Sequence, residues 1–150
     1  MLFRSTAARP GPVLGLAADA IAGLGHEDAL IVQGVEGSVD PYVATQSRGM
    51  RLLGGMTVPL RVLPEDYALL FAEESPQLHE DRLEAAVVAN SRALLGAPGP
   101  ERAAAVLGAA LLISVVRSSQ PLADCLGEAI EALESGAAEA RLRALGWNPR

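Results

Sequence analysis

The sequence has only one cysteine, Cys125, so an internal disulfide bond is excluded. It also contains no C-x-x-C pair and no cluster of cysteine and histidine at the spacing of zinc ligands. Arg4 and Arg9 interrupt the opening apolar residues, which predicts no signal peptide, and the uncharged run 103–116 is too short to span a bilayer. We therefore expect a soluble, cytoplasmic protein without a membrane segment.

Lysine is absent, and all twelve basic residues are arginine. The eighteen aspartates and glutamates give a net charge of -6, which argues against nonspecific nucleic-acid binding because such binding needs a basic face. Arg48, Arg51 and Arg61 nevertheless fall in one segment. They either meet a phosphate group or are solvated on a hairpin, and the sequence leaves both interpretations open.

The length of 150 residues predicts one domain, which we place at 1–146, followed by a tail at 147–150. A chain of this size buries roughly 68 to 70 per cent of its unfolded surface, which is enough for a stable core without disulfide bonds or metal ions. The first forty residues predict a strand at 2–5, a helix at 13–24 and a strand at 29–32. That order predicts a right-handed parallel βαβ unit.

An antiparallel ribbon is expected next, because two glycines, Gly54 and Gly55, separate the apolar runs 48–53 and 56–62. The rest of the chain is predicted to be helical, and the helix without charge between 103 and 116 should be central and buried. Ser118 and Ser119 are interpreted as caps of the helix that follows. The predicted helices are 80–95, 101–117, one beginning at 122, and 137–145. The predicted fold class is α/β, with a small, mainly parallel sheet, an antiparallel hairpin and covering helices.

Two carboxylates, Glu36 and Asp40, follow the predicted strand 29–32 in a glycine-containing turn. Ligands of open α/β sheets gather beyond the carboxyl ends of the strands. Magnesium bound to a pyrophosphate needs one or two carboxylates, so Glu36 and Asp40 are a tentative magnesium site. The alternative is that Asp40 caps a turn before Pro41 and that Glu36 is solvated.

No catalytic residue is predicted, because the remaining reactive side chains form no triad and no acid–base pair. His26 and His79 lack partners at ligand spacing and are expected at the surface. Cys125 shares a helix face with apolar residues and is interpreted as a buried hydrophobe rather than a nucleophile. Trp147 is either an anchor for a partner protein or part of an untethered tail.

Three stretches of the sequence together carry a resemblance to a known family. They are LGHEDALIVQGVEGSVD at 24–40, VLPEDYAL at 62–69, and the run from AAVLGAALLISVV to EARLRAL at 104–145. In this order they resemble the C-terminal portion of anthranilate phosphoribosyltransferase-like proteins of glycosyltransferase family three, over residues 2–145. The resemblance implies a nucleoside phosphorylase/phosphoribosyltransferase-like α/β domain.

The sequence also departs from that family. The family's G-T-G-G-D loop, whose backbone N–H groups hold the diphosphate of phosphoribosyl pyrophosphate, has no counterpart here, and neither has the small helical domain. The paired Asp-Glu that helps hold magnesium in the family is replaced by residues 37–40, so that Asp40 keeps a carboxylate and Glu36 lies nearby. This form looks more like the divergent, non-tryptophan branch of the family.

Two functions are compatible with the resemblance. The chain is either part of a split or multi-chain phosphoribosyltransferase, which binds phosphoribosyl pyrophosphate only when another chain completes it, or a nonenzymatic interaction or regulatory module. The isolated chain is predicted to be inactive. Because a strand at 2–5 or 29–32 would keep an unpaired edge, we expect a homo-oligomer or a complex with a partner protein that buries residues 2–24.

Overall fold

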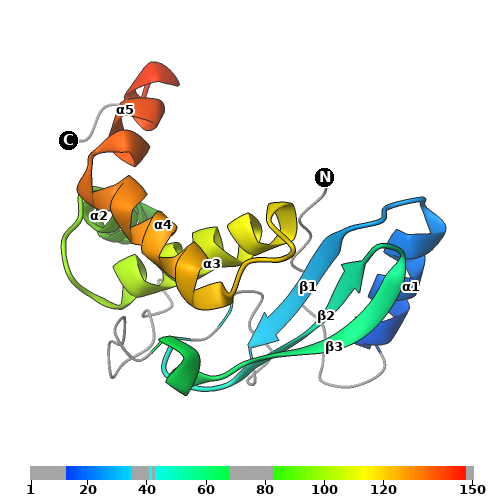
Figure 1. Ribbon diagram of the computed structural model, residues 1–150. Coiled ribbons are helices and arrows are strands. Elements are labelled where there is room, and N and C mark those ends of the chain that lie inside the picture. Colours follow the sequence, from blue (N-terminus) through cyan, green and yellow to red (C-terminus); the bar gives the residue numbers. More distant parts are fainter. Residues whose placement is uncertain (1–12, 35–40, 42, 68–82, 148–150) are drawn as a thin grey trace.

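The computed structural model describes residues 13–34, 41, 43–67 and 83–147 of the chain. The described elements form an α/β fold in which a small sheet lies beside a group of helices (Figure 1). In chain order they are α1 (Val13–Gly23), β1 (Ala29–Gly34), β2 (Ser47–Leu53), β3 (Met56–Val62), the 3-10 helix η1 (Pro64–Tyr67), α2 (Leu83–Leu94), α3 (Pro100–Val116), α4 (Leu122–Glu134) and α5 (Ala137–Ala144).

The predicted hairpin is confirmed. Strands β2 and β3 pair antiparallel from Ser47 opposite Val62 to Leu53 opposite Met56. Gly54 and Gly55 between them both have positive φ, 54° and 79°, the region that a tight hairpin turn requires and that glycine adopts without strain. Both glycines are exposed, as expected for a hairpin tip.

The predicted parallel character of the sheet is not shown by these strands. The described sheet has the order β1-β2-β3, and both of its pairings are antiparallel. The expected parallel partner of β1 was the strand at 2–5, which lies outside the described residues. The chain order helix, strand, hairpin is therefore as predicted, and the three described strands form a meander. The predicted βαβ unit stays a prediction, because its first strand lies outside the described residues.

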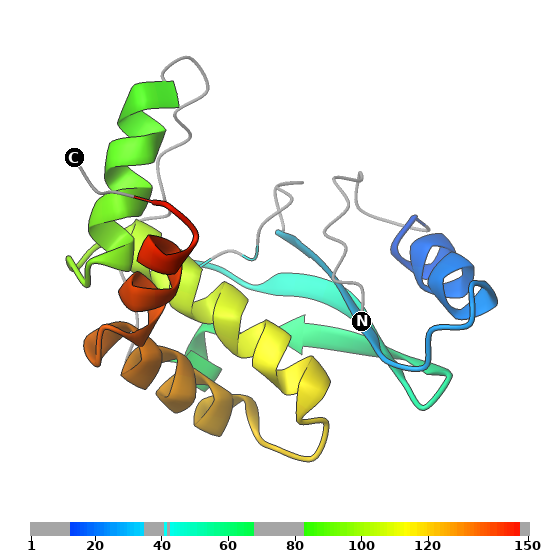
Figure 2. The same ribbon diagram turned by 90° about the horizontal axis from the view of Figure 1, so that it is seen from above.

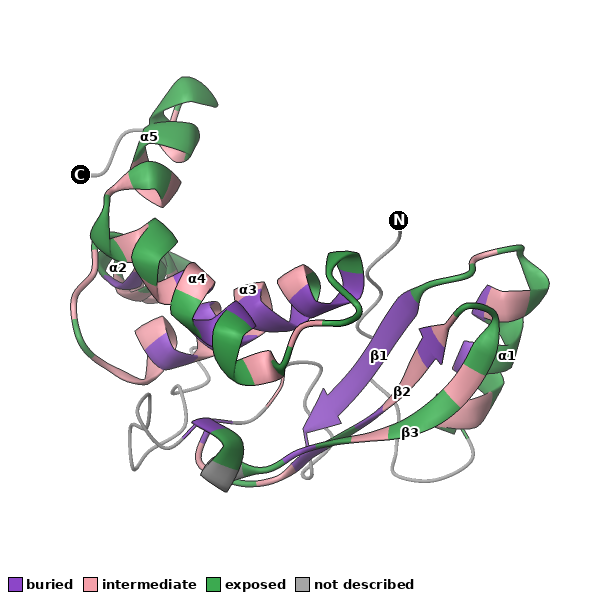
Figure 3. Cartoon of the chain, viewed as in Figure 1, coloured by how far each residue is buried: buried purple, intermediate pink, exposed green. Residues whose placement is uncertain are grey.

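Helices cover both faces of the sheet (Figure 2). Because successive residues of β1 point to opposite faces, Leu30 and Val32 enter the core under α3 and α4, whereas Ala29 and Ile31 pack with α1. All six residues of β1 are buried, and the strand is coloured as buried along its whole length in Figure 3. The predicted strand at 29–32 is therefore confirmed, and β1 extends two residues beyond it, to Gly34.

Helix α3 is the central helix, as its uncharged sequence predicted. Seven of its residues are buried, and it packs against α4, α2 and β1.

Helix α2 has exposed apolar side chains. Leu83, Val87 and Val88 are 79%, 52% and 56% exposed. Among the described helices, none is long and apolar enough to cross a membrane.

The serine caps predicted for the next helix are wrong. Helix α4 starts at Leu122, its N-cap is Pro121, and no side chain caps it. The carbonyl oxygen of Pro121 accepts the backbone N–H groups of Asp124 and Cys125, so the first turn closes without a hydroxyl group. Ser118 and Ser119 instead lie in the exposed turn that precedes the cap.

Candidate functional site

The predicted magnesium ligands Glu36 and Asp40 lie outside the described residues. What the structure describes is the strand that leads to them. Strand β1 ends at Gly34, and its last side chain before that glycine, Gln33, is only 3% exposed. Within the described residues, no group of three or more histidine, cysteine, aspartate or glutamate side chains could hold a metal ion.

The three arginines predicted to share one segment do lie on the hairpin, but they do not form one group. Arg48 and Arg61 are directly opposite each other on β2 and β3 and are both exposed. Arg51 is three residues further along β2 and therefore points to the other face. Its Nη2 donates a 2.7 Å hydrogen bond to the carbonyl oxygen of Ser114 near the C-terminal end of α3. Arg51 is thus a structural residue.

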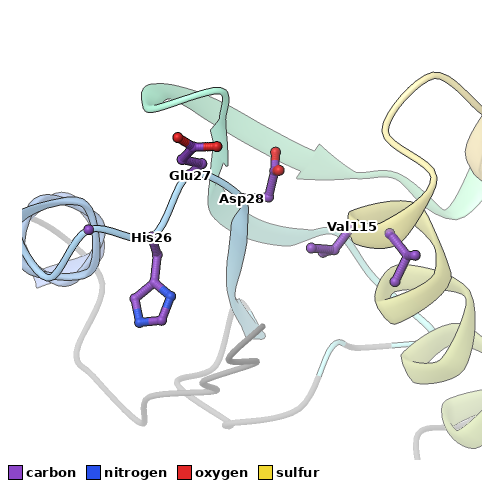
Figure 4. A pocket seen from close by; sticks show the side chains of 6 residues that line it. His26, Glu27, Asp28 and Val115 are labelled. Carbon is purple, nitrogen blue, oxygen red and sulfur yellow. The ribbon is translucent and has the colours of Figure 1, made fainter.

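An open cavity of about 400 Å³ lies between the turn before β1 and the end of α3. Its lining is Gly25, His26, Glu27, Asp28, Val115 and Val116. Figure 4 shows that the ring of His26 and the carboxylate of Glu27 point in opposite directions, so the polar groups do not converge on one point. The carboxylate of Asp28 lies within 3.4 Å of the backbone N–H of Gly54, and the carbonyl oxygen of Glu27 accepts from Gly55. These contacts hold the hairpin tip and do not form a catalytic constellation.

Of the other candidate residues, Cys125 lies as predicted, His26 and Trp147 differ from their predictions, and His79 is not described. Cys125 is fully buried in the cluster beneath α3 and α4, as a small hydrophobe and not as an accessible thiol. His26 is half-buried at the cavity, while His79 lies outside the described residues. The backbone N–H of Trp147 donates to the carbonyl oxygen of Leu142, so this residue is tied to the end of α5.

The fold resembles that of a solved phosphoribosyltransferase. A variant of anthranilate phosphoribosyltransferase from Saccharomyces cerevisiae with Mg bound matches 94% of this chain and 40% of its own length, with a TM-score of 0.71 and 15% sequence identity. At 15% sequence identity, this structural similarity shows a shared fold and nothing more. No family model matches the sequence.

Curated relatives extend the likeness to the sequence. Anthranilate phosphoribosyltransferases from Rhodopseudomonas palustris (strain TIE-1) and Desulfatibacillum aliphaticivorans are each 30% identical over 128 residues, which cover 85% of this chain. The enzyme from Paracidovorax citrulli is 28% identical over 139 residues, or 89% of this chain. The chain is related to the C-terminal part of anthranilate phosphoribosyltransferase. It spans 38% of the length of these relatives.

This relationship agrees with the resemblance carried by the three stretches of sequence. It confirms the α/β class and the family. One feature of the site was missed from sequence. The exposed pair Arg48 and Arg61 was grouped with Arg51, although the alternation of side chains along the two strands separates them.

Proposed function

We propose that this chain provides the C-terminal α/β part of a phosphoribosyltransferase site that a further polypeptide segment completes. The observation that carries the proposal is the extent of the alignment. It covers 85% of this chain but only 38% of the length of the anthranilate phosphoribosyltransferase that it matches. In this proposal the reaction transfers a phosphoribosyl group from phosphoribosyl pyrophosphate to an amine of an aromatic acid. Anthranilate, named by the relatives, is the first acceptor to test.

The proposed role of this chain is to hold the magnesium–diphosphate end of the donor. Strand β1 is buried on both faces, which fixes the point from which the turn with Glu36 and Asp40 starts. Two carboxylates after a strand are a donor set that suits Mg²⁺, which takes one or two carboxylates together with phosphate oxygens and water. A solved member of the same fold with Mg bound supports magnesium as the metal.

Two features of the described part favour association with another polypeptide. Strand β1 is an edge of the described sheet, and a further strand that pairs with it would come either from another polypeptide or from residues of this chain outside the described part. Helix α2 exposes Leu83, Val87 and Val88, which all lie within its first two turns. In a separate chain, these surfaces would bind the complementing segment or, in the alternative of a nonenzymatic module, a partner protein or a second copy.

The test is a turnover assay of the purified chain, in which consumption of anthranilate fluorescence is followed with Mg²⁺ and phosphoribosyl pyrophosphate present. The isolated chain should show no turnover. Addition of the remainder of the Rhodopseudomonas palustris relative, expressed separately, should produce turnover that depends on both polypeptides. Turnover by the isolated chain would show that catalysis needs no further polypeptide segment. A stable complex without any turnover would favour the nonenzymatic module.

A further inference from the structure

A row of hydrogen-bond donors crosses the sheet at the end of β1. Gln33 on β1 is paired with Arg48 on β2, and Arg48 is paired with Arg61 on β3. Directly paired residues of neighbouring strands project from the same face, so the three side chains lie side by side. We call Gln33, Arg48 and Arg61 the donor row.

The donor row shares its sheet face with α1 but lies beyond the residues that this helix covers. Helix α1 packs on Ala29, Ile31 and Leu52, with Met50 partly buried beside them. These belong to the next two rows of the register, Ile31–Met50 and Ala29–Leu52. At the donor row the face is exposed over Arg48 and Arg61, whereas Gln33 at the β1 end of the row is buried.

The positive charge of the donor row is not balanced within the described part of the chain. The ion pairs found there involve Arg102, Arg117 and Arg143, each with a glutamate, and none involves Arg48 or Arg61. Like charges directly opposite each other on two strands are destabilising. In a protein with a net charge of -6, two arginines in register that form no ion pair within the described residues are therefore a local concentration of positive charge.

Gln33 adds an independent indication of a missing acceptor. Its side chain is 3% exposed, and its Nε2 is buried without a hydrogen-bond partner. A buried donor that lacks an acceptor destabilises the folded state, so such groups are uncommon in folded proteins unless water or a ligand satisfies them. A guanidinium group has donors only, and so the neighbouring Arg48 offers Nε2 no acceptor.

We propose that the donor row binds a phosphoryl or diphosphate group of a small molecule. Opposed residues have Cβ atoms about 4.5 to 5.5 Å apart, so both guanidinium groups can reach oxygens of one phosphate-like anion. Each guanidinium presents a planar fork of N–H donors that matches two such oxygens. A phosphoryl group supplies three oxygens and a double negative charge, which suits two cations and one neutral donor better than a single carboxylate does. This binding needs neither transfer activity nor another polypeptide, so it goes beyond the proposed function.

Calorimetric titration of the full 150-residue chain with sodium pyrophosphate, at constant ionic strength and without magnesium, tests the proposal. The native chain should show saturable binding, with weaker binding of inorganic phosphate and weaker still of benzoate. The double variant Arg48→Gln/Arg61→Gln should bind pyrophosphate about tenfold more weakly or worse, because charge-assisted hydrogen bonds to both guanidinium groups are lost. Benzoate binding as tight as pyrophosphate binding would overturn the phosphoryl assignment.

The matched control is Arg92→Gln/Arg141→Gln. It removes the same charge from exposed positions on α2 and α5, which no described ion pair involves. The affinity of this control variant for pyrophosphate should stay within about twofold of the native value, because exposed charges beyond the Debye length are screened. Equal weakening in both double variants would mean that net charge alone attracts the anion. Absence of saturable binding by the native chain would also overturn the proposal.

Arginine modification of the native chain makes the test independent of whether the variants fold. Phenylglyoxal should modify Arg48 and Arg61 readily, and pyrophosphate should protect both from it. Arg92 should react at the same rate with and without pyrophosphate. Mass spectrometry of the digested protein reads each site separately. Protection of all exposed arginines alike, or of none, would contradict a site at the donor row.

Discussion

Gly49 lies at a close approach between β1 and β2, and its replacement by alanine is an informative perturbation of the fold. Gly49 pairs with Val32 in the register of the two strands. A Cβ atom added at Gly49 would lie 2.2 Å from the carbonyl oxygen of Ile31 and 3.3 Å from the Cα of Val32. Both are backbone atoms of a buried strand, so neither can rotate away.

The expected cost of Gly49→Ala combines two contributions. Overpacking of a well-packed interior costs about 1 to 3 kcal/mol. Separation of β1 from β2 to relieve the clash would weaken ladder hydrogen bonds, each with a net value of about 0.5 to 1.5 kcal/mol. We expect a loss of about 3 kcal/mol in the free energy of unfolding, which is a large part of the 5 to 15 kcal/mol typical of a domain.

Urea unfolding followed by circular dichroism measures this change as a lower transition midpoint. The matched control is Gly108→Ala in α3, where an added Cβ would meet nothing within 4 Å. Glycine in a helix interior is less favourable than alanine by about 1 kcal/mol, so this variant should be at least as stable as the native protein. A loss below about 1 kcal/mol for Gly49→Ala would refute the close approach of the two strands.

Three further substitutions test separate contacts by the same urea measurement. Arg51→Met should lower the free energy of unfolding by about 1.5 to 3 kcal/mol, because the carbonyl oxygen of Ser114 loses a charged donor at the end of a helix. An unchanged midpoint would show that this contact contributes nothing. Gly136→Ala should cost about 1 to 2 kcal/mol, since the residue between α4 and α5 has a φ of 74° that alanine adopts only with strain. Glu134→Gln should cost less than about 1 kcal/mol, because its ion pair with Arg102 is largely exposed on the glutamate side; a loss comparable to that of Arg51→Met would contradict this.

The local elements were predictable where a short stretch of sequence determines the structure. Two glycines between apolar runs favour a tight hairpin turn, because glycine adopts positive φ without strain, and the turn is found at Gly54 and Gly55. The apolar run 29–32 predicted a strand and the uncharged run 103–116 predicted a central, buried helix, and both are found. In each case the signal and the structure lie within the same residues.

The features that depend on contacts between distant residues were not predictable in the same way. Gly49 carries no turn signal, and its requirement for glycine arises only from the approach of Ile31 across the sheet. The serines before α4 looked like caps, but the carbonyl oxygen of Pro121 takes the first N–H groups instead. Gln33 follows the apolar run 29–32, and only the register reveals that it lies beside Arg48.

The most direct measurement of the proposed function is phosphoribosyl transfer by a chimera. The C-terminal part of the Rhodopseudomonas palustris enzyme that matches this chain would be replaced by this chain, and the product would be assayed with Mg²⁺, phosphoribosyl pyrophosphate and anthranilate. We predict turnover by the folded chimera and its loss in the Glu36→Gln/Asp40→Asn variant at unchanged melting temperature. A folded chimera that binds phosphoribosyl pyrophosphate without any transfer, or turnover unaffected by the double substitution, would contradict the role proposed for this chain.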